Sequence, residues 1–217
     1  MKSKIIYFLR NPLQILVVPI TKLPFFSFVR ETNDYQCRIR FETWFVQKVL
    51  NIGGNRSAYW PVHYTSTVHD ADRIFVGVDT CPGLSKGCYI QGKGGIYIGD
   101  YTQIGPQVVI VSANHNPYDS REHILSEVTI GKYCWLGAGA KIMPGVTLGD
   151  WTIVAAGAVV TKAFPNGHCV IGGVPAKKIK ELDPEKCKPF HNQHEYYGYI
   201  KKKDFQNYKE RYLNLKW

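Results

Sequence analysis

The clearest pattern in the chain is an aliphatic residue that recurs at every sixth position from residue 130 onward. Its members are Ile130, Leu136, Ile142, Leu148, Val154 and Val160. Four positions after each of the first five comes a small or modest side chain, namely Cys134, Ala140, Val146, Thr152 and Ala158. A period of six fits neither the 3.6-residue turn of a helix nor the two-residue alternation of an ordinary strand. It predicts a three-sided coil in which each hexapeptide supplies one short strand and one corner, with the aliphatic side chain inside.

The same period continues upstream, although with interruptions. It occurs at Ile98, Ile104 and Ile110, and again at Val62, Val68 and Ile74, with an ambiguous glycine-rich register between these two groups. Between Ile110 and Ile124 the spacing is fourteen residues, eight more than one hexapeptide. The extra residues predict a loop at 114–123 that leaves a regular wall, and such loops commonly carry chemistry.

The pattern divides the chain into three regions. Residues 1–60 form an apolar and aromatic N-terminal arm, residues 61–175 form the coil domain with its loop at 114–123, and residues 176–217 form a basic C-terminal tail. Within the tail, Phe205, Tyr208 and Tyr212 have the spacing of a helix. The expected fold class is therefore an all-β solenoid with a helical or irregular arm and a helical tail.

Composition and charge narrow the range of functions. The 217 residues are 45% hydrophobic and 20% charged, which excludes disorder throughout, and 20 glycines with 12 prolines argue against a helical bundle. The formal net charge is +10, from 27 Lys and Arg against 17 Asp and Glu. Such an excess favours an anionic partner, for example a phosphorylated cofactor, an acidic glycan, a membrane surface or nucleic acid. The chain contains no recognised nucleic-acid motif, so we expect no nucleic-acid partner.

The N-terminus and the cysteines bear on where the protein works. The longest uncharged stretch near the N-terminus, 11–21, is far shorter than the roughly 20 apolar residues that span a bilayer. The arm can instead lie on a membrane surface through its basic residues or pack on the rest of the protein. Six cysteines without a C-x-x-C motif favour reduced thiols. We therefore expect a cytoplasmic protein, with peripheral contact at the inner face of the membrane as an option.

Two continuous stretches resemble a known family. They are VTIGKYCWLGAGAKIMPGVTLGDWTIVAAGAVVTKAFPNGHCVIGGVPAKKIK at 128–180 and IGDYTQIGPQVVIVSANHNPYD at 98–119. Both are similar to the hexapeptide-repeat acyltransferases, and closest in look to the O-acetyltransferases of bacterial polysaccharides. The resemblance covers about half of the chain. It implies a left-handed parallel β-helix, which is an exception to the right-handed rule for parallel strands.

The resemblance also implies a reaction and its residues. In this family the histidine of the motif that matches SANH, here His115, is the general base that activates a sugar hydroxyl. Asp119 is a candidate for orienting that imidazole because it lies close in sequence. The donor implied is acetyl-CoA, bound along the outside of the coils. The matching positions for this co-substrate are Ala138, Ala156, Thr161 and Lys162, with Lys177 and Lys180 near the adenosine phosphates.

The acceptor side and the assembly follow from the same resemblance. Ser85 and Gln91, in the glycine-rich passage, are candidates for orienting a glycan acceptor, and Trp135 is a candidate for lining the thioester site. The family places its active sites between subunits, so we expect a homotrimer in which His115 of one chain faces acetyl-CoA bound partly by another. A short stack of coils also leaves flat outer faces that need partners.

Several alternatives remain open at this point. An N-acetyltransferase of a nucleotide-linked amino sugar and a xenobiotic O-acetyltransferase share the fold. A β-helical zinc carbonic anhydrase would use His63 and His69, which are one hexapeptide apart but lack a third histidine in register. A cysteine nucleophile would use Cys134 or Cys169. A binding module would use the aromatic and basic residues around 196–203.

Overall fold

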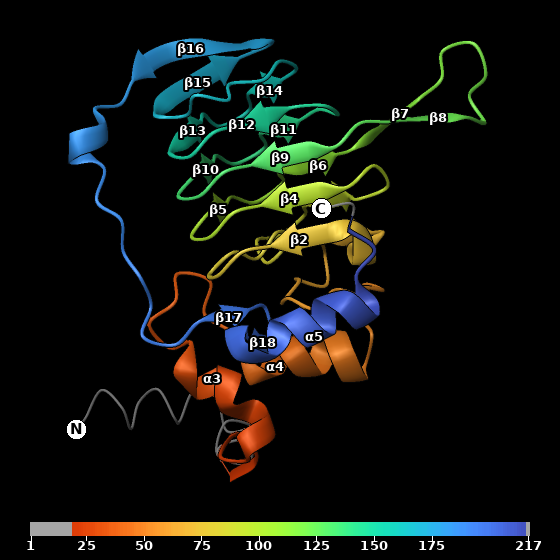
Figure 1. Ribbon diagram of the computed structural model, residues 1–217. Coiled ribbons are helices and arrows are strands. Elements are labelled where there is room, and N and C mark those ends of the chain that lie inside the picture. Colours follow the sequence, from red (N-terminus) through yellow and green to blue (C-terminus); the bar gives the residue numbers. More distant parts are fainter. Residues whose placement is uncertain (1–18, 216–217) are drawn as a thin grey trace.

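The computed structural model describes residues 19–215, and its centre is a stack of coils whose short strands form three sheets (Figure 1). Sheet A consists of β1 (Thr67–His69), β3 (Tyr89–Gln91), β6 (Val109–Val111), β11 (Lys141–Ile142) and β14 (Val159–Val160). Sheet B consists of β2 (Ile74–Val76), β4 (Ile96–Ile98), β9 (Val128–Ile130) and β12 (Thr147–Leu148). Sheet C consists of β5 (Gln103–Ile104), β10 (Trp135–Leu136), β13 (Thr152–Val154), β15 (Cys169–Gly173) and β16 (Ala176–Glu181).

From β3 to β13 the chain visits the three sheets in turn, in the order A, B, C. In the upper coils, Lys141 pairs with Val159, Trp135 pairs with Ile153, and both pairings are parallel. Each pair is eighteen residues apart, which is three hexapeptides for each turn of the coil. The parallel sheets and the six-residue period that the sequence predicts are therefore confirmed.

The interior of the coils contains the residues that the pattern selects. Ile130, Leu136, Ile142 and Val160 are all 0% exposed. The smaller residues four positions later are also inside, because Cys134, Ala140, Val146, Thr152 and Ala158 are each at most 1% exposed. The aliphatic columns fill the space between the three sheets, and the small side chains allow the wall to turn at its corners.

The two irregular passages differ from the regular coils in length. Thr67 pairs with Tyr89 and Ile74 pairs with Ile96, so the first coil is 22 residues long and resolves the ambiguous register there. The later interruption is longer than the eight residues inferred from Ile124. Ile124 is 50% exposed and lies outside the wall, which resumes at Val128. The prediction that Ile124 continues the aliphatic column is wrong, because its strand belongs to the protruding loop.

The C-terminal region runs back along the coils to their base. β16 pairs antiparallel with β15, so sheet C continues to Glu181. A short 3₁₀ turn, η4 (Pro184–Lys186), follows, and the chain then descends beside the stack to the hairpin of β17 (Tyr196–Tyr197) and β18 (Ile200–Lys201), as Figure 1 shows. The predicted tail helix is confirmed as α5 (Lys202–Tyr212). The division of the chain into domains at 60 and 175 stays a prediction.

The described part of the N-terminal arm is helical and packs under the coils against the tail. It contains η1 (Pro24–Phe26), α3 (Ser27–Glu31), α4 (Phe41–Trp44) and a π-helical turn, η2 (Phe45–Val49), while η3 (Ala71–Arg73) lies within the first coil. The ring of Phe28 contacts that of Tyr199 at 5.3 Å, and Tyr35 donates a hydrogen bond to the His194 carbonyl at 2.8 Å. The arm and the tail, far apart in sequence, therefore form one base for the coils.

Glu31 makes the contact between arm and tail sensitive to acid. Burial alone would raise the pKa of Glu31, but hydrogen bonds from Tyr196 and Lys201, and the charge of Lys201, hold the pKa below its usual 4.5. A carboxylate whose pKa is lower in the folded state stabilises the fold above its unfolded pKa, and this contribution is lost as the pH falls through the folded value.

We therefore expect Glu31→Gln to lower the thermal midpoint at pH 7, and the difference from the unsubstituted protein to shrink below pH 4.5. Thermal unfolding followed across pH measures both effects. Glu42→Gln, on the exposed side of α4, is the matched control. If the difference in thermal midpoint between Glu31→Gln and the unsubstituted protein stayed constant from pH 7 to below pH 4, Glu31 would not be the acid-sensitive group.

Between residues 19 and 215, no helix is both long and apolar enough to cross a bilayer. The uncharged stretch at 11–21 and the basic residues Lys2, Lys4 and Arg10 lie mostly or wholly outside the described residues.

Candidate active site

The protruding loop leaves the coils at the corner where the chain turns from sheet A to sheet B, here called the A–B corner. β7 (Ala113–His115) and β8 (His123–Leu125) pair antiparallel and form its stem. Ser126 N–H donates to the Ser112 carbonyl at 2.9 Å and closes the stem where it joins the wall. Gly94 lies directly below, where an added Cβ would be 2.0 Å from that carbonyl oxygen. Glycine at position 94 therefore allows the loop to rest closely on the coil beneath it.

His115 stands exposed at the end of β7, and its two ring nitrogens have different environments. Nδ1 is 2.7 Å from the Ser120 carbonyl oxygen across the loop. A carbonyl oxygen can only accept, so Nδ1 carries the proton and Nε2 of the neutral ring is the unprotonated, basic nitrogen. Nε2 has no hydrogen-bond partner among residues 19–215. The loop thus holds an imidazole in the tautomer that a general base requires.

His123 lies beside His115 across the stem. The two residues are paired in the antiparallel register, and their ring centroids are 4.5 Å apart. Partial desolvation, together with the nearby Lys93 and His115, lowers the pKa of His123. A neutral His123 adds a flat packing surface for the His115 ring without placing a second positive charge next to it.

Asp119 does not contact His115. Its carboxylate accepts from Arg121 instead, with Oδ2 2.6 Å from Nη2 and Oδ1 2.9 Å from Nε, and this hydrogen bonding lowers the pKa of Asp119. The fork of Arg121 satisfies both carboxylate oxygens, and the turn of the loop brings the Ser120 carbonyl to His115. The orienting group that the sequence assigned to Asp119 is thus a backbone oxygen in this structure.

Gln91 and Ser85 lie at different corners. Gln91 ends β3 beside the loop stem, and its Oε1 accepts from Ser112 N–H at 3.3 Å. Ser85 lies near the corner where the chain turns from sheet C to sheet A, the C–A corner, and its hydroxyl donates to the Ile104 carbonyl at 2.7 Å. Of the two candidates, the structure brings only Gln91 close to the base of the His115 loop.

Ala138 and Ala156 both lie at the C–A corner, directly above one another in successive coils. Both are exposed, and Gly157 N–H donates to the Ala138 carbonyl at 2.8 Å. Neither the Ala138 N–H nor the Ala156 N–H donates a hydrogen bond within the described residues. Unused amides beside small side chains leave the backbone open to a ligand at this corner.

The remaining candidates for the donor are spread over the upper coils. Thr161 and Lys162 are exposed and follow β14 at the A–B corner. Lys177 and Lys180 are exposed on β16, opposite Gly172 and Val170. Trp135 points outward from β10 on sheet C and is 57% exposed. Within one chain, His115 and Ala138 therefore stand at different corners and do not meet.

The rival chemistries depend on other residues. All six cysteines are free, and burial raises the pKa of the Cys134 thiol to about 12 and also raises that of Cys169. A thiol with a raised pKa is a poor nucleophile at neutral pH. Of the pair named for a zinc site, His63 accepts from or donates to Thr65 at 2.8 Å, while the His69 ring packs on Tyr89.

Comparison with known proteins identifies the repeat that builds the coils. Residues 127–162 match the model of the bacterial transferase hexapeptide (six repeats). The chain is 35% identical to the galactoside O-acetyltransferase of Escherichia coli over 92 residues, which are 41% of this chain and 45% of the relative. It is also 35% identical over 103 residues to an Escherichia coli O-acetyl transferase named for lipopolysaccharide biosynthesis, covering 42% of this chain and 52% of the relative.

A solved structure extends the likeness to most of the fold. Galactoside acetyltransferase in complex with coenzyme A superposes with a TM-score of 0.55 at 24% identity, over 83% of this chain and 90% of that one. The chain spans about half the length of the curated relatives that it matches. The matched repeat model and these relatives confirm that the two motifs resemble hexapeptide-repeat acetyltransferases, and the solved structure has the same fold.

Proposed function

We propose that the protein is an O-acetyltransferase that moves acetyl from acetyl-CoA to a sugar hydroxyl of a surface polysaccharide or of its lipid-linked or oligosaccharide precursor. The observation that carries the proposal is the His115 ring, whose Nδ1 is fixed on the Ser120 carbonyl while Nε2 is left open as a base. The names of the relatives, which act on galactosides or belong to lipopolysaccharide biosynthesis, support a sugar acceptor.

Each step assigns one role to a residue of this chain. Acetyl-CoA, when bound, supplies the acetyl group as a thioester. Nε2 of His115 takes the proton of the acceptor hydroxyl as its oxygen attacks the thioester carbonyl carbon. The unused N–H of Ala138 is available to stabilise the negative charge that develops on the carbonyl oxygen, a contribution of roughly 3 kcal/mol. As the carbon–sulfur bond breaks, the imidazolium of His115 returns the proton to the departing thiolate.

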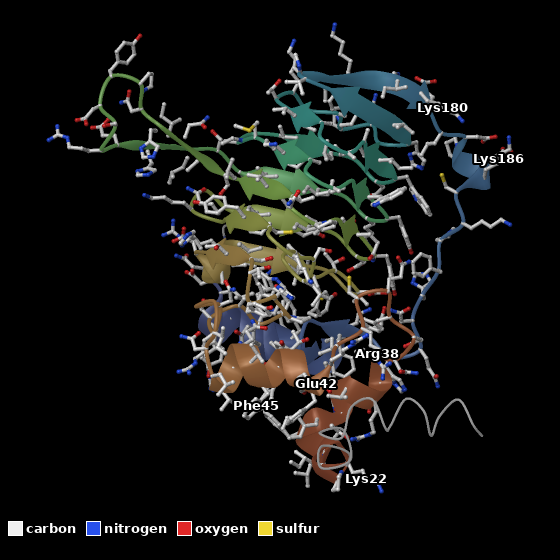
Figure 2. All side chains as sticks on the ribbon, turned by 180° about the vertical axis from the view of Figure 1, so that it is seen from behind. Lys22, Arg38, Glu42, Phe45, Lys180 and Lys186 are labelled. Atoms are coloured by element: carbon white, nitrogen blue, oxygen red, sulfur yellow. The ribbon has the colours of Figure 1, made fainter. Side chains whose placement is uncertain are left out.

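The residues proposed to hold acetyl-CoA match its chemistry. Ala138 and Ala156 offer exposed small side chains and open amides to the pantetheine arm. Four further exposed residues complete the set, Thr161, Lys162, Lys177 and Lys180. The three lysines suit the phosphates of the nucleotide end. Figure 2 shows Lys180 at the end of the coil stack that lies farthest from Phe45 in the arm.

A homotrimer of left-handed coils would explain why His115 and Ala138 lie apart within one chain. His115 projects from the A–B corner, whereas Ala138 lies at the C–A corner, so one chain alone does not assemble both halves of the site. A second copy whose loop reaches the C–A corner of the first would complete it. Sedimentation equilibrium should report three chains, and a stable monomer with full activity would contradict this assembly.

A peripheral membrane position is supported by the underside of the arm. Phe25, Phe45 and Val49 are 69%, 38% and 46% exposed. The ring of Phe25 contacts that of Trp44, with their centroids 5.9 Å apart. Figure 2 shows Phe45 and the basic Lys22 at this same end of the molecule. Apolar side chains next to a cation suit the anionic inner leaflet. Co-sedimentation with anionic vesicles, but not with neutral ones, is expected.

The proposed reaction is tested by incubating the protein with acetyl-CoA and a panel of surface oligosaccharides. Thiol release and acetylated products, identified by mass spectrometry, are the two readouts. Matched acceptors that differ only in carrying a hydroxyl or an amine distinguish O-acetyl transfer from N-acetyl transfer. Acetylation confined to the amine acceptors, or the absence of acetylation on every sugar, would overturn the proposal.

A further inference from the structure

A column of aromatic side chains stands in unfavourable backbone conformations at the corner between sheets B and C, here called the B–C corner. Tyr101, Tyr133 and Trp151 occupy equivalent positions in three successive coils, and their φ angles are +59°, +54° and +58°. This left-handed region favours glycine and asparagine and is a genuine outlier for bulky residues. The same corner is left-handed at Asp79 in the first coil and at His168 in the last, so the conformation belongs to the turn itself. What distinguishes the three middle coils is that they place a bulky aromatic residue in it.

The rings of the column form a continuous stack. The Tyr101 and Tyr133 centroids are 5.2 Å apart with planes 13° from parallel, and the Tyr133 and Trp151 centroids are 4.6 Å apart at 12°. The descending tail holds the stack from outside, where Tyr133 donates to the Phe190 carbonyl at 3.0 Å and Asn192 N–H donates to the Tyr101 hydroxyl at 3.3 Å. The rings are therefore fixed in place before any ligand arrives.

This column forms one wall of a pocket of about 480 Å³. Its other walls include Gln103 and Trp135 of sheet C and Gln36 of the arm. The volume lies within the roughly 300–1,000 Å³ that is usual for sites of small ligands. An added Cβ on Gly105, which also lines the pocket, would lie 2.9 Å from the Ala138 nitrogen, so the pocket borders the C–A corner.

The residues that line the pocket are uncharged. None of its lining residues is Lys, Arg, Asp, Glu or His, although the chain as a whole carries +10. The indole N–H groups of Trp135 and Trp151 and the side-chain amide of Gln36 have no hydrogen-bond partner between residues 19 and 215. The Gln103 amide is held in one orientation by the Asp79 carbonyl, to which its Nε2 donates at 3.2 Å. The pocket thus combines fixed aromatic surface with a few neutral polar groups.

We propose that this pocket binds a neutral sugar ring of the acceptor glycan. This inference rests on the proposed function and specifies its substrate class. The C–H face of a pyranose packs on aromatic rings, and its hydroxyls can pair with indole N–H groups and amides. A carboxylate or a phosphate would be desolvated here with no cation to compensate it. Lys162 at the A–B corner and Lys177 and Lys180 on β16 then serve the donor phosphates, and the sugar unit beside the thioester is uncharged.

The test measures sugar binding without catalysis. In the His115→Asn protein, isothermal titration calorimetry is carried out with a panel of neutral gluco-, galacto- and manno-oligosaccharides, with trigalacturonate and with CoA. We expect at least one neutral oligosaccharide to bind and trigalacturonate to bind at least tenfold more weakly. Trp151→Asn, added to this background, should weaken the neutral ligand at least tenfold and leave the affinity for CoA unchanged. Asparagine tolerates the positive φ, so this substitution relieves strain in the coil.

Control variants keep the proposal falsifiable. Trp135→Phe retains a ring but removes an N–H donor and should weaken sugar binding less than Trp151→Asn, whereas Trp44→Phe in the arm should have no effect. Failure of every neutral sugar to bind, or a parallel loss of CoA affinity in Trp151→Asn, would overturn the proposal. The proposed function fails separately if neutral sugars bind at this pocket but never become acetylated by the unsubstituted protein.

Discussion

His115→Asn is expected to lower the rate of acetyl transfer by about 10²- to 10⁴-fold, the range that a general base contributes. The substitution removes the imidazole that the Ser120 carbonyl holds through Nδ1 at 2.7 Å, and with it the open Nε2. Because the proposed acetyl-CoA contacts, Ala138 and Ala156, lie at another corner, the affinity for acetyl-CoA should change little. Steady-state thiol release measures the rate, and CoA titration measures the affinity.

Two matched variants show whether the effect is specific. His69→Asn removes an exposed histidine that lies on sheet A, away from the loop, and packs on Tyr89; this variant should keep full activity. Asp119→Asn should reduce activity less than about twofold, because the Asp119 carboxylate binds Arg121 and not His115. Equal activity in His115→Asn and the unsubstituted protein would remove the catalytic role, and a large loss in Asp119→Asn would restore the carboxylate as the orienting group.

The coils were predictable because their packing is local and repeated. Ile130 and Leu148 lie in neighbouring strands of one sheet and are both buried, so a one-dimensional period carries the three-dimensional pattern. The period fails at the inserted loop, where the aliphatic Ile124 lies in the stem and is half exposed. The contact of arm and tail is equally invisible to periodicity, because Phe28 and Tyr199 meet across 171 positions of sequence.

The candidate site was predictable only where a side chain would carry the proposed chemistry. The SANH motif located His115, but its orienting partner is the Ser120 carbonyl, and a backbone oxygen has no sequence signature. The open amides at Ala138 and Ala156 came from the resemblance alone. A signal for the aromatic column does exist, because each ring follows a glycine by two positions, at Gly99, Gly131 and Gly149. However, only the register of the coils shows that these three positions lie above one another and that Tyr101, Tyr133 and Trp151 form one stack.

Gln47→Leu is expected to destabilise the fold by about 3–5 kcal/mol, because several buried polar groups lose their partner at about 1–3 kcal/mol each. Gln47 is 1% exposed at the base of the coils, within η2. Its Nε2 donates to the carbonyls of Asn55 and Trp60, both at 3.0 Å, and of Ala58 at 3.1 Å. Its Oε1 accepts from Val62 N–H at 3.0 Å and from the Tyr199 hydroxyl at 2.7 Å.

Leucine has a similar size but no polar atom. The Asn55 and Ala58 carbonyls keep bonds from Ala58 N–H and Lys48, but the Trp60 carbonyl, the Val62 N–H and the Tyr199 hydroxyl lose their partner, at about 1–3 kcal/mol for each one that water does not reach. Denaturant unfolding measures the loss. Gln206→Leu on the exposed face of α5 should change stability by less than about 0.5 kcal/mol, and Tyr199→Phe, which removes one of the five bonds, should cost about 1 kcal/mol. Equal stability in Gln47→Leu and Gln206→Leu would mean that Gln47 does not join the arm, the first coil and the tail. A loss several times larger than that of Tyr199→Phe would mean that this one amide holds the base on which the coils rest.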